Sequence, residues 1–339
     1  MKTVVDLYCG SGAVTLGLKK AGFRVIGAVD FDPIACATYR SNHPEVQLIE
    51  EDIKTVEPSV FSAVGQEGLD LLVVCAPCQP FSNRNNNRSS KDVRINLVLE
   101  SLRFVEALQP QMVFFENVPG LGKQPVFKKL AKGLSDLGYT LSEPRHVDAA
   151  DLGVPQRRQR MILVAAKDES ILQDATALSF TARRSVRTTI GDLPVPPIRA
   201  SAERGDVLHF SRLHAAITME RLKHIPTDGG SRASLPDRLQ LACHKNCDAN
   251  SFPDSYGRMK WDDVAPTLTT GCTDLTKGRY AHPEQNRSIT LREAARLQSF
   301  PDDYLFKGNA SQIATQIGNA VPPQMMFGIA QTLHAALSS

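Results

Sequence analysis

The sequence predicts an α/β protein, with a doubly wound, mostly parallel sheet joined to a smaller, irregular region. From the start of the chain to about residue 166, short apolar runs rich in β-branched residues alternate with segments of helical periodicity. From about residue 181 to 282, prolines, glycines and charges dominate, and no helical period persists for long. Alternating strands and helices are typical of a parallel sheet that is covered on both faces.

The first region contains most of the expected regular elements. Strands are expected at residues 4–8, 24–29, 69–74, 112–116 and 160–166, and helices at residues 13–21, 33–42, 95–108 and 126–137. A strong helical pattern returns at 290–299, and the chain from residue 322 onward reads as a closing helix. We expect this last helix to pack back on the first region.

Length and composition indicate a globular chain with ample core. Its 339 residues are enough for one large domain plus a smaller one. A hydrophobic fraction of 42% is ordinary for a globular protein. Its apolar runs are far shorter than the roughly 20 residues of a membrane span, and the first residues lead directly into a strand. We therefore expect a cytoplasmic protein with no signal peptide and no anchor.

The cysteines favour reduced thiols. There are seven, an odd number that fits a reducing cytosol better than a disulfide framework. Cys243, His244 and Cys247 supply only half of a usual zinc ligand set, and no second pair stands at a matching interval. A loop or core contact is the better interpretation, and no metal is expected.

The charge is unevenly distributed along the chain. The formal net charge is +3, yet residues 183–260 contain 13 Lys or Arg against 8 Asp or Glu, together with four of the eight histidines. A locally basic segment fits a polyanion surface such as nucleic acid. A solvated basic face is an equally common cause, so both interpretations stay open.

Cys78 stands in a rigid turn directly after an apolar run. The chain reads Ala76-Pro77-Cys78-Gln79-Pro80, and each proline restricts its own φ and the residue before it. A cysteine in an apolar segment is more often buried filler. The stiff turn instead favours a positioned nucleophile at the end of a strand.

A glycine turn follows the first predicted strand. Gly10 and Gly12 would let backbone amides at a helix N-terminus approach a ligand closely, although a tight turn without a ligand is the simpler alternative. Thr15 stands where a dinucleotide fingerprint needs a third glycine, which disfavours a pyrophosphate. Asp30 with Phe31 suits a ribose and a nucleobase. Together with Asp52 they indicate an adenosine-bearing cofactor without a pyrophosphate.

Glu116 ends another apolar strand, in the run Phe114-Phe115-Glu116-Asn117. Burial of a carboxyl group tends to raise its pKa and allows it to donate a proton near neutral pH, and a capping or salt-bridged carboxylate is the alternative interpretation. Further along, alternation would place Arg158 and Arg160 on one face of a strand. This pair would hold a phosphate or stabilise a thiolate, unless it belongs to a solvated basic loop.

The order of these segments closely resembles the bacterial-type DNA (cytosine-5)-methyltransferase family. Five motifs carry the resemblance over nearly the whole chain: PCQPFS, ENV, QRRQR, LREAARLQSFP (residues 291–301) and QIGNAVP (residues 316–322). Any one could arise by chance, but all five stand in the family's order. The resemblance implies a Rossmann-like S-adenosylmethionine-dependent methyltransferase fold with a smaller target-recognition domain.

The resemblance also implies a division of the chain and a mechanism. Residues 1–180 and 312–339 would form the catalytic domain, and residues 181–311 the target-recognition domain and hinge. The enzyme would flip a cytosine out of duplex DNA. Cys78 would attack carbon 6, Glu116 would stabilise ring nitrogen 3, and Arg158 and Arg160 would lie near the thiol and the base. S-adenosylhomocysteine would be released.

Carried over position by position, the resemblance implies two binding sets. The cofactor set comprises Leu7, Gly10, Gly12, Asp30, Phe31, Asp52, Ile53, Pro77, Leu97, Asn319 and Ala320. The DNA set comprises Ser82, Arg84 and Arg88 in a polar loop that would close over DNA, and Arg258, Thr267 and Leu268 in the second domain. The first turn departs from the family pattern, because Tyr8 and Cys9 stand where many relatives have Phe and Ala.

Other functions are compatible with parts of this pattern. The same catalytic set serves cytosine-5 methylation of transfer RNA, and a non-catalytic DNA-binding protein could retain the fold, although it would be expected to lose Cys78 or Glu116. We expect a monomer with double-stranded DNA as its partner, in a restriction-modification system. The recognised DNA sequence depends on irregular loops between residues 201 and 277, which no spacing rule translates into bases.

Overall fold

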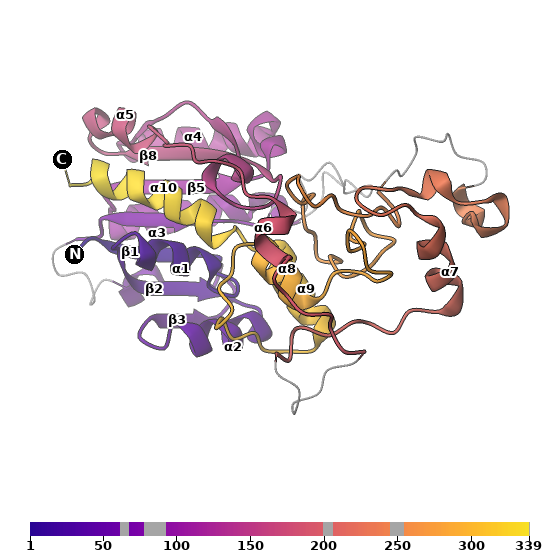
Figure 1. The fold of residues 1–339 in the computed structure, drawn as a ribbon. Coiled ribbons are helices and arrows are strands. Elements are labelled where there is room, and N and C mark those ends of the chain that lie inside the picture. The colour runs from indigo at the N-terminus through magenta and orange to yellow at the C-terminus, as the bar shows by residue number, and fades with distance from the viewer. Residues whose placement is uncertain (62–67, 78–92, 199–205, 245–253, 339) are drawn as a thin grey trace. The chain divides into compact units, whose positions relative to one another are not determined.

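The computed structural model describes residues 1–61, 68–77, 93–198, 206–244 and 254–338 (Figure 1). The chain divides into two compact units. Unit 1 comprises Met1–Leu152, Gln159–Thr181 and Val321–Ser339, and unit 2 comprises Gly153–Arg158 and Ala182–Ala320. The helix at residues 310–319, which the sequence analysis assigned in large part to the first domain, thus lies in unit 2.

Unit 1 is built on an eight-stranded mixed sheet with the order β3-β2-β1-β4-β5-β8-β6, while β7 also pairs with β8. The strands are β1 (Thr3–Leu7), β2 (Arg24–Asp30), β3 (Gln47–Glu50), β4 (Leu71–Val74), β5 (Met112–Asn117), β6 (Thr140–Leu141), β7 (Arg145–Asp148) and β8 (Gln159–Ala166). Strands β1 to β5 pair in parallel, and β8 runs antiparallel to its neighbours. The carboxyl ends of five strands therefore meet at one edge.

The helices of unit 1 lie in the connections between these strands, except α5 and α10, which follow the last strand, β8 (Figure 1). They are α1 (Ala13–Lys20), α2 (Pro33–Asn42), α3 (Ser101–Leu108), α4 (Pro125–Asp136), α5 (Leu172–Ala175) and α10 (Pro323–Ala336). Short 3₁₀ helices complete the unit: η1 (Pro58–Phe61), η3 (Val93–Glu100), η4 (Pro119–Lys123), η5 (Ala149–Leu152) and η6 (Glu169–Ile171). In the described part of the chain, no helix has the length and apolar character to cross a bilayer.

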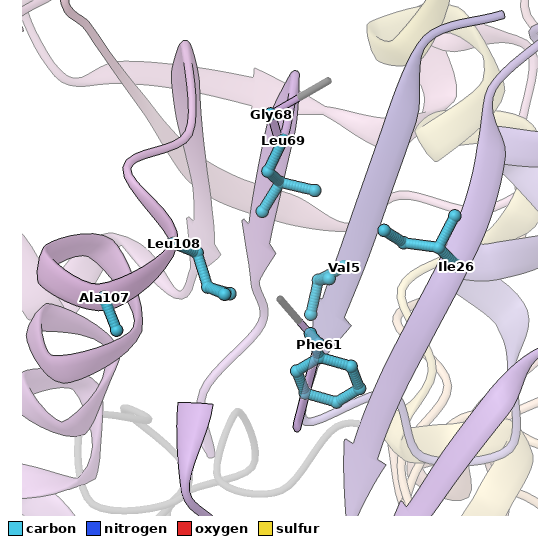
Figure 2. A pocket seen from close by; sticks show the side chains of 7 residues that line it. All are labelled: Val5, Ile26, Phe61, Gly68, Leu69, Ala107 and Leu108. Carbon is cyan, nitrogen blue, oxygen red and sulfur yellow. The ribbon is translucent and has the colours of Figure 1, made fainter. Parts of the chain in front are cut away.

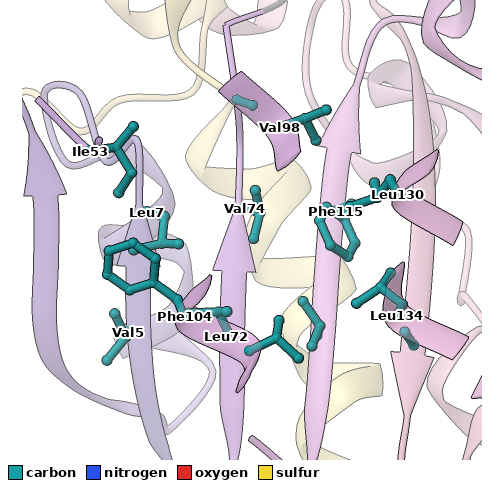
Figure 3. Close-up of a cluster of buried hydrophobic side chains, with 14 of the residues drawn as sticks. Val5, Leu7, Ile53, Leu72, Val74, Val98, Phe104, Phe115, Leu130 and Leu134 are labelled. Atoms are coloured by element: carbon teal, nitrogen blue, oxygen red, sulfur yellow. The ribbon is translucent and has the colours of Figure 1, made fainter. Parts of the chain in front are cut away.

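One face of the sheet forms the main hydrophobic core with α3 and α4 (Figure 3). Alternate strand residues such as Leu7, Val74 and Phe115 meet Phe104 of α3 and Leu130 of α4. The central strands are buried on both sides, since β1 and β4 have no exposed residue. This is the expected pattern for a covered parallel sheet and explains their continuous apolar runs.

The closing helix packs on unit 1 as predicted. Helix α10 lies against α1, and Gly17 stands at their closest approach. A Cβ atom at Gly17 would come 2.7 Å from the Pro323 carbonyl oxygen and 2.8 Å from the Met326 Cβ, so a larger residue would force the helices apart.

Unit 2 contains few regular elements in its described residues. They are α6 (Val186–Ile190), α7 (Ala216–His224), η8 (Arg232–Ser234), η9 (Asp237–Leu239), η10 (Ala242–His244), α8 (Leu291–Leu297) and α9 (Ala310–Asn319). Isolated bridges such as Arg258 with Ala281 replace extended ladders. A small core gathers Leu222, Leu239, Tyr256 and Leu275. The expectation of an irregular region is thus confirmed for this part of the chain.

Candidate active site

The candidate site of unit 1 lies at the carboxyl edge of the sheet. Strands β1 to β5 are parallel, so the residues that follow them are brought to the same edge. The chain order reverses around β1, whose neighbours are β2 and β4. Open α/β sheets bind ligands at such a switch point.

The glycine turn after β1 is shaped for close backbone approach. Gly10 and Gly12 have φ values of 53° and 91°, in the region that favours glycine. Gly12 caps α1 without any side-chain hydrogen bond to the helix N-terminus. A Cβ atom at Gly10 would meet no atom within 4 Å, so there is open space beside this turn.

Asp30 is held in place by backbone N–H groups. Its Oδ2 accepts from the Gly10 N–H at 2.8 Å, and its Oδ1 accepts from the Asp32 N–H at 2.9 Å. Burial raises the pKa of this carboxyl, and the two N–H bonds oppose that rise. The neighbouring Phe31 ring is 67% exposed, so its face is available to a planar ligand. The structure therefore joins Gly10 and Asp30, as a shared cofactor site requires.

The other unit 1 residues of the predicted cofactor set occupy the same edge in different ways. Asp52 is exposed and accepts from the Lys54 N–H at 3.1 Å, whereas Ile53 is 4% exposed and belongs to the core. Leu97 in η3 and Pro77 are half-buried. The Leu7 side chain points into the core (Figure 3), so only its backbone reaches the edge.

Glu116 forms a buried ion pair with Arg160. The Arg160 Nε lies 2.7 Å from the Glu116 Oε1, and the two residues are 7% and 6% exposed. Strand β8 is antiparallel to β5, which brings Arg160 beside the end of β5. A guanidinium at this distance stabilises the charged carboxylate. A salt-bridged carboxylate was one of the alternatives that the sequence left open for Glu116, and its partner is Arg160.

Asn117 links the end of β5 to the chain leading toward Cys78. Its Nδ2 donates to the Ala76 carbonyl oxygen at 3.0 Å, and its Oδ1 accepts from the Val118 N–H at 2.9 Å. Asn117 is 2% exposed. The position of Ala76 relative to Glu116 is therefore fixed by a buried side-chain bond.

Arg158 and Arg160 are both buried, and they bond different partners. Arg158 lies in unit 2 just before β8 begins, and its guanidinium donates to the carbonyl oxygens of Leu268 at 2.9 Å and Gly318 at 3.0 Å. Arg157 and Gln159 are exposed whereas Arg158 and Arg160 are buried, which is the alternation predicted for this run. The role of the two arginines near the thiol and the base stays a prediction.

Asn319 and Ala320 also lie in unit 2, at the end of α9. The Ala320 carbonyl accepts from Gln298 Nε2 at 2.7 Å, which joins this end to α8. Their contribution to a cofactor site in unit 1 stays a prediction.

The predicted DNA contacts in unit 2 are corrected in part. Arg258 is 1% exposed, and its guanidinium donates to the carbonyl oxygens of Leu222, Ile225, His282 and Gln285 and to Asn286. It is bound within unit 2 and is not available to a phosphate. Leu268 is 0% exposed, so its side chain has no surface to offer DNA. Thr267 is half-buried and donates to the Arg157 carbonyl at 2.7 Å.

Four predicted site residues lie outside the residues that the structure describes. They are the nucleophile Cys78 and the DNA-contacting residues Ser82, Arg84 and Arg88. Cys247 of the disfavoured zinc set also falls there. Among the residues that are described, no group of three or more metal-ligating side chains comes together.

Three further residues, Tyr8, Arg103 and His43, bond the backbone at this edge and were not among the predicted site residues. The Tyr8 hydroxyl donates to the Leu97 carbonyl, and Arg103 donates to carbonyls of the loop after β3. His43 Nε2 lies 3.0 Å from the Gly12 carbonyl oxygen, and burial lowers the pKa of His43 to about 4. Of the three residues, only Tyr8 stood out in the sequence, as a departure from the family pattern in the first turn.

An apolar pocket elsewhere in unit 1 is unrelated to this edge (Figure 2). It is lined by Val5 of β1, Ile26 of β2, Phe61 of η1, Gly68 and Leu69 before β4, and Ala107 and Leu108 of α3. None of these described lining residues has a polar side chain, so the pocket offers no group for chemistry.

Comparison with known proteins decides the family. The family model for C-5 cytosine-specific DNA methylase matches residues 2–335. The chain belongs to this family. Members are S-adenosylmethionine-dependent methyltransferases, so the chain is a DNA (cytosine-5-)-methyltransferase and DNA is its substrate.

Sequence similarity to individual members of the family extends over almost the whole chain. The type II methylase M.HgiDII of Herpetosiphon aurantiacus is 36% identical over 338 residues, covering 97% of this chain and 94% of the relative. The type II methyltransferase M.Eco47II of Escherichia coli is 31% identical over 347 residues, covering 98% and 78%. These bacterial enzymes confirm the predicted bacterial-type resemblance.

Solved structures confirm the fold. The S. pombe Dnmt2 methyltransferase matches with a TM-score of 0.66 and 18% identity, covering 100% of both chains. The Entamoeba histolytica methyltransferase EhMeth matches with a TM-score of 0.69 and 15% identity, covering 100% of this chain and 99% of that one. The predicted α/β methyltransferase fold is therefore correct.

Proposed function

We propose that this methyltransferase acts on cytosines in a specific duplex DNA sequence through a covalent bond to Cys78, as the modification enzyme of a restriction-modification system. The observation that carries the proposal is the bond from Asn117 Nδ2 to the Ala76 carbonyl at 3.0 Å. It joins the end of β5, where Glu116 stands, to Ala76, two residues before Cys78 in the sequence. The names of the bacterial type II relatives support the restriction-modification role.

The residues at this edge fit S-adenosylmethionine, which supplies a methyl group when it is bound. The open space beside Gly10 and the uncapped N-terminus of α1 suit the methionine end. Asp30 suits the ribose hydroxyls, and the exposed ring of Phe31 suits the adenine. Asp52 would accept from the adenine amino group, and Asn319 and Ala320 would complete the site.

The chemistry assigned to this chain begins with the Cys78 thiolate. Its sulfur forms a bond to carbon 6 of a flipped cytosine, which makes carbon 5 nucleophilic enough to accept the methyl group. Glu116 acts in its protonated form: it gives its proton to ring nitrogen 3 as negative charge develops there, and the Arg160 guanidinium stabilises the carboxylate that is left. Loss of the carbon 5 proton to a base then breaks the sulfur–carbon bond and restores the thiolate.

The test compares two cysteines on the same segment. Purified wild type, Cys78→Ser and Cys75→Ser are incubated with tritiated S-adenosylmethionine and duplex DNA containing diverse cytosine contexts. Wild type and Cys75→Ser should label the DNA, whereas Cys78→Ser should bind the cofactor without transferring the methyl group. Methyl transfer by Cys78→Ser at the native rate would overturn the covalent mechanism.

A second measurement detects the covalent step directly. With 5-fluorocytosine in the recognised site, fluorine cannot leave carbon 5 as a proton does, so the adduct persists after denaturation. It should form with wild type and Cys75→Ser only. Competition between duplex DNA and transfer RNA tests the substrate class, and bisulfite sequencing of DNA from expressing cells identifies the target cytosine.

Unit 2 is assigned the target-recognition role. Its irregular, partly basic chain supplies many loops, and sequence reading needs side chains that reach base edges. We further assign a monomeric, metal-free, cytoplasmic enzyme. Sedimentation with and without DNA, and activity after dialysis against a chelator, test these assignments.

A further inference from the structure

The segment made of η3 and α3 (residues 93–108) is tied to the carboxyl edge of the sheet at two points. The first tie is the Tyr8 hydroxyl, which donates to the Leu97 carbonyl oxygen at 2.5 Å. Burial raises the pKa of the Tyr8 phenol well above its usual value, so the hydroxyl keeps its proton and remains a donor.

Tyr8 occupies an unusual backbone conformation. Its φ of 64° lies in the left-handed region, which residues other than glycine rarely adopt. Such a conformation persists only where the surroundings hold it, and it is common at functional sites. The backbone turns at Tyr8 from β1 into the glycine turn, while the side chain reaches across to η3.

The second tie is Arg103 of α3. Its Nη2 donates to the Val56 carbonyl at 2.9 Å, and its Nη1 donates to the carbonyls of Ile53 at 3.3 Å and Lys54 at 3.2 Å. Glu100 lies 3.3 Å from the same Nη1 and orients the guanidinium. A planar guanidinium can serve several acceptors at once, which an ammonium on a flexible stem cannot reproduce.

Both ties end on segments of the proposed cofactor site. Tyr8 bonds η3, which contains Leu97 of the proposed cofactor set. Arg103 bonds the loop after β3, which contains Asp52 and Ile53 of the same set. In Figure 3, Ile53 and Val98 lie toward the carboxyl ends of the strands relative to Val5 and Leu72. The two acceptor segments therefore share the edge where the adenosine end is assigned.

We propose that Tyr8 and Arg103 are positioning residues that fix the adenosine end of the cofactor site, Tyr8 by holding the Leu97 segment and Arg103 by holding the loop of Asp52 and Ile53. This inference rests on the proposed cofactor site. Neither side chain touches the reacting atoms assigned above. Loosening either tie should therefore weaken cofactor binding and leave the methyl-transfer step at saturating cofactor unchanged.

The test uses Tyr8→Phe, which removes only the hydroxyl, and Arg103→Lys, which keeps the charge. Titration calorimetry measures the Kd of S-adenosylhomocysteine for the full chain. We expect each variant to bind roughly three- to ten-fold more weakly. The KM for S-adenosylmethionine should rise by a similar factor, while kcat stays within two-fold. Binding of 5′-methylthioadenosine, which lacks the amino acid end, should weaken equally.

Matched controls come from the same unit. The Tyr139 hydroxyl also donates to a backbone carbonyl, that of Pro110 at 2.6 Å, but before the start of β5. Arg40 Nη1 donates to the Glu50 carboxylate at 2.6 Å, and Glu50 is the last residue of β3, so this arginine bonds a side chain and not the loop carbonyls. Tyr139→Phe and Arg40→Lys should leave the Kd unchanged, even where the midpoint of urea unfolding falls.

The outcomes separate this inference from the one on which it rests. Tyr8→Phe and Arg103→Lys variants that bind S-adenosylhomocysteine as tightly as wild type, with only a lower unfolding midpoint, would overturn the positioning role and leave the cofactor site intact. A wild-type chain that binds neither S-adenosylhomocysteine nor S-adenosylmethionine would overturn the cofactor site and this inference with it.

Discussion

Each unit of the molecule contains a buried glutamate paired with an arginine, and the two pairs are built differently. In unit 2, Arg287 bonds both oxygens of Glu293, at 2.6 and 2.7 Å, and the Thr290 N–H donates to the same carboxylate at 2.7 Å. Burial tends to raise the pKa of Glu293, but these bonds outweigh it and hold that pKa below its usual range.

The Glu116–Arg160 pair of unit 1 is assembled from two strands instead. Its ion pair at 2.7 Å joins the end of β5 to the start of β8, at the edge where the predicted site residues gather. Glu293 belongs to a local capping box that begins α8. Burial and an arginine partner thus occur in both, and the position at a strand end distinguishes the candidate catalytic carboxylate from the structural one.

The largest effect that would sharpen this comparison is on catalysis. Glu116→Gln should lower the kcat of methyl transfer by about 10²- to 10⁴-fold, because a neutral amide cannot supply the proton or charge that general acid catalysis requires. Single-turnover transfer to the recognised duplex measures it. If the Glu116→Gln variant has the kcat of wild type, Glu116 has no role in the chemical step.

Glu293→Gln should have the opposite profile. Removing one charge of a buried pair leaves Arg287 uncompensated and should reduce the free energy of unfolding by about 3–5 kcal/mol. Urea denaturation measures this loss. The kcat per folded molecule should stay within a few-fold of wild type, and a selective loss of kcat without loss of stability would contradict the distinction between the pairs.

Asp6 offers a third buried carboxyl, which has a hydroxyl partner. The Thr15 hydroxyl donates to its Oδ2 at 2.8 Å, and in the described structure its Oδ1 has no hydrogen-bond partner. Burial raises the pKa of Asp6 to about 7. The folded chain therefore binds a proton that the unfolded chain releases near pH 4, and this group's contribution to stability falls as the pH rises from about 4 to 7.

Asp6→Asn should remove that pH dependence. The stability of the variant relative to wild type should increase from about pH 4 to pH 7, by on the order of 4 kcal/mol, and level off above pH 7. Urea unfolding of both proteins across this range gives the difference curve. A flat difference would mean that Asp6 titrates normally.

Arg258 provides the smallest of these effects. Arg258 is a structural residue that donates to backbone carbonyls. The Arg258→Lys variant should therefore have a free energy of unfolding about 1–2 kcal/mol lower than wild type, because lysine cannot serve all the acceptors. The slope of DNA affinity against salt concentration should stay the same. A slope reduced by about one would instead restore Arg258 as a phosphate contact.

Local chemistry was sufficient to predict most of unit 1. Strands β1, β2, β4, β5 and β8 were all located within a few residues, because continuous apolar runs between turn residues identify buried parallel strands. Strand β3 was missed, since Gln47–Glu50 is short, polar at both ends and lies at the edge of the sheet. Strands β6 and β7 were missed for similar reasons of length.

The sequence by itself also determined which residues stand at the ends of strands. Gly10, Asp30, Asp52 and Glu116 each follow or end an apolar run, and parallel pairing brings such positions to one edge whatever the details of packing. The family motifs then pointed to the same residues.

Only the tertiary structure decided what the charged and hydroxyl groups bond to. Arg258 and Arg158 resemble DNA-binding or catalytic arginines in the sequence, yet both donate to backbone carbonyls from distant segments. The Tyr8 and Arg103 ties likewise depend on carbonyls far away along the chain. Every residue has a backbone carbonyl, so the sequence does not show which carbonyl will accept from a given side chain. These partners are known only from the folded structure.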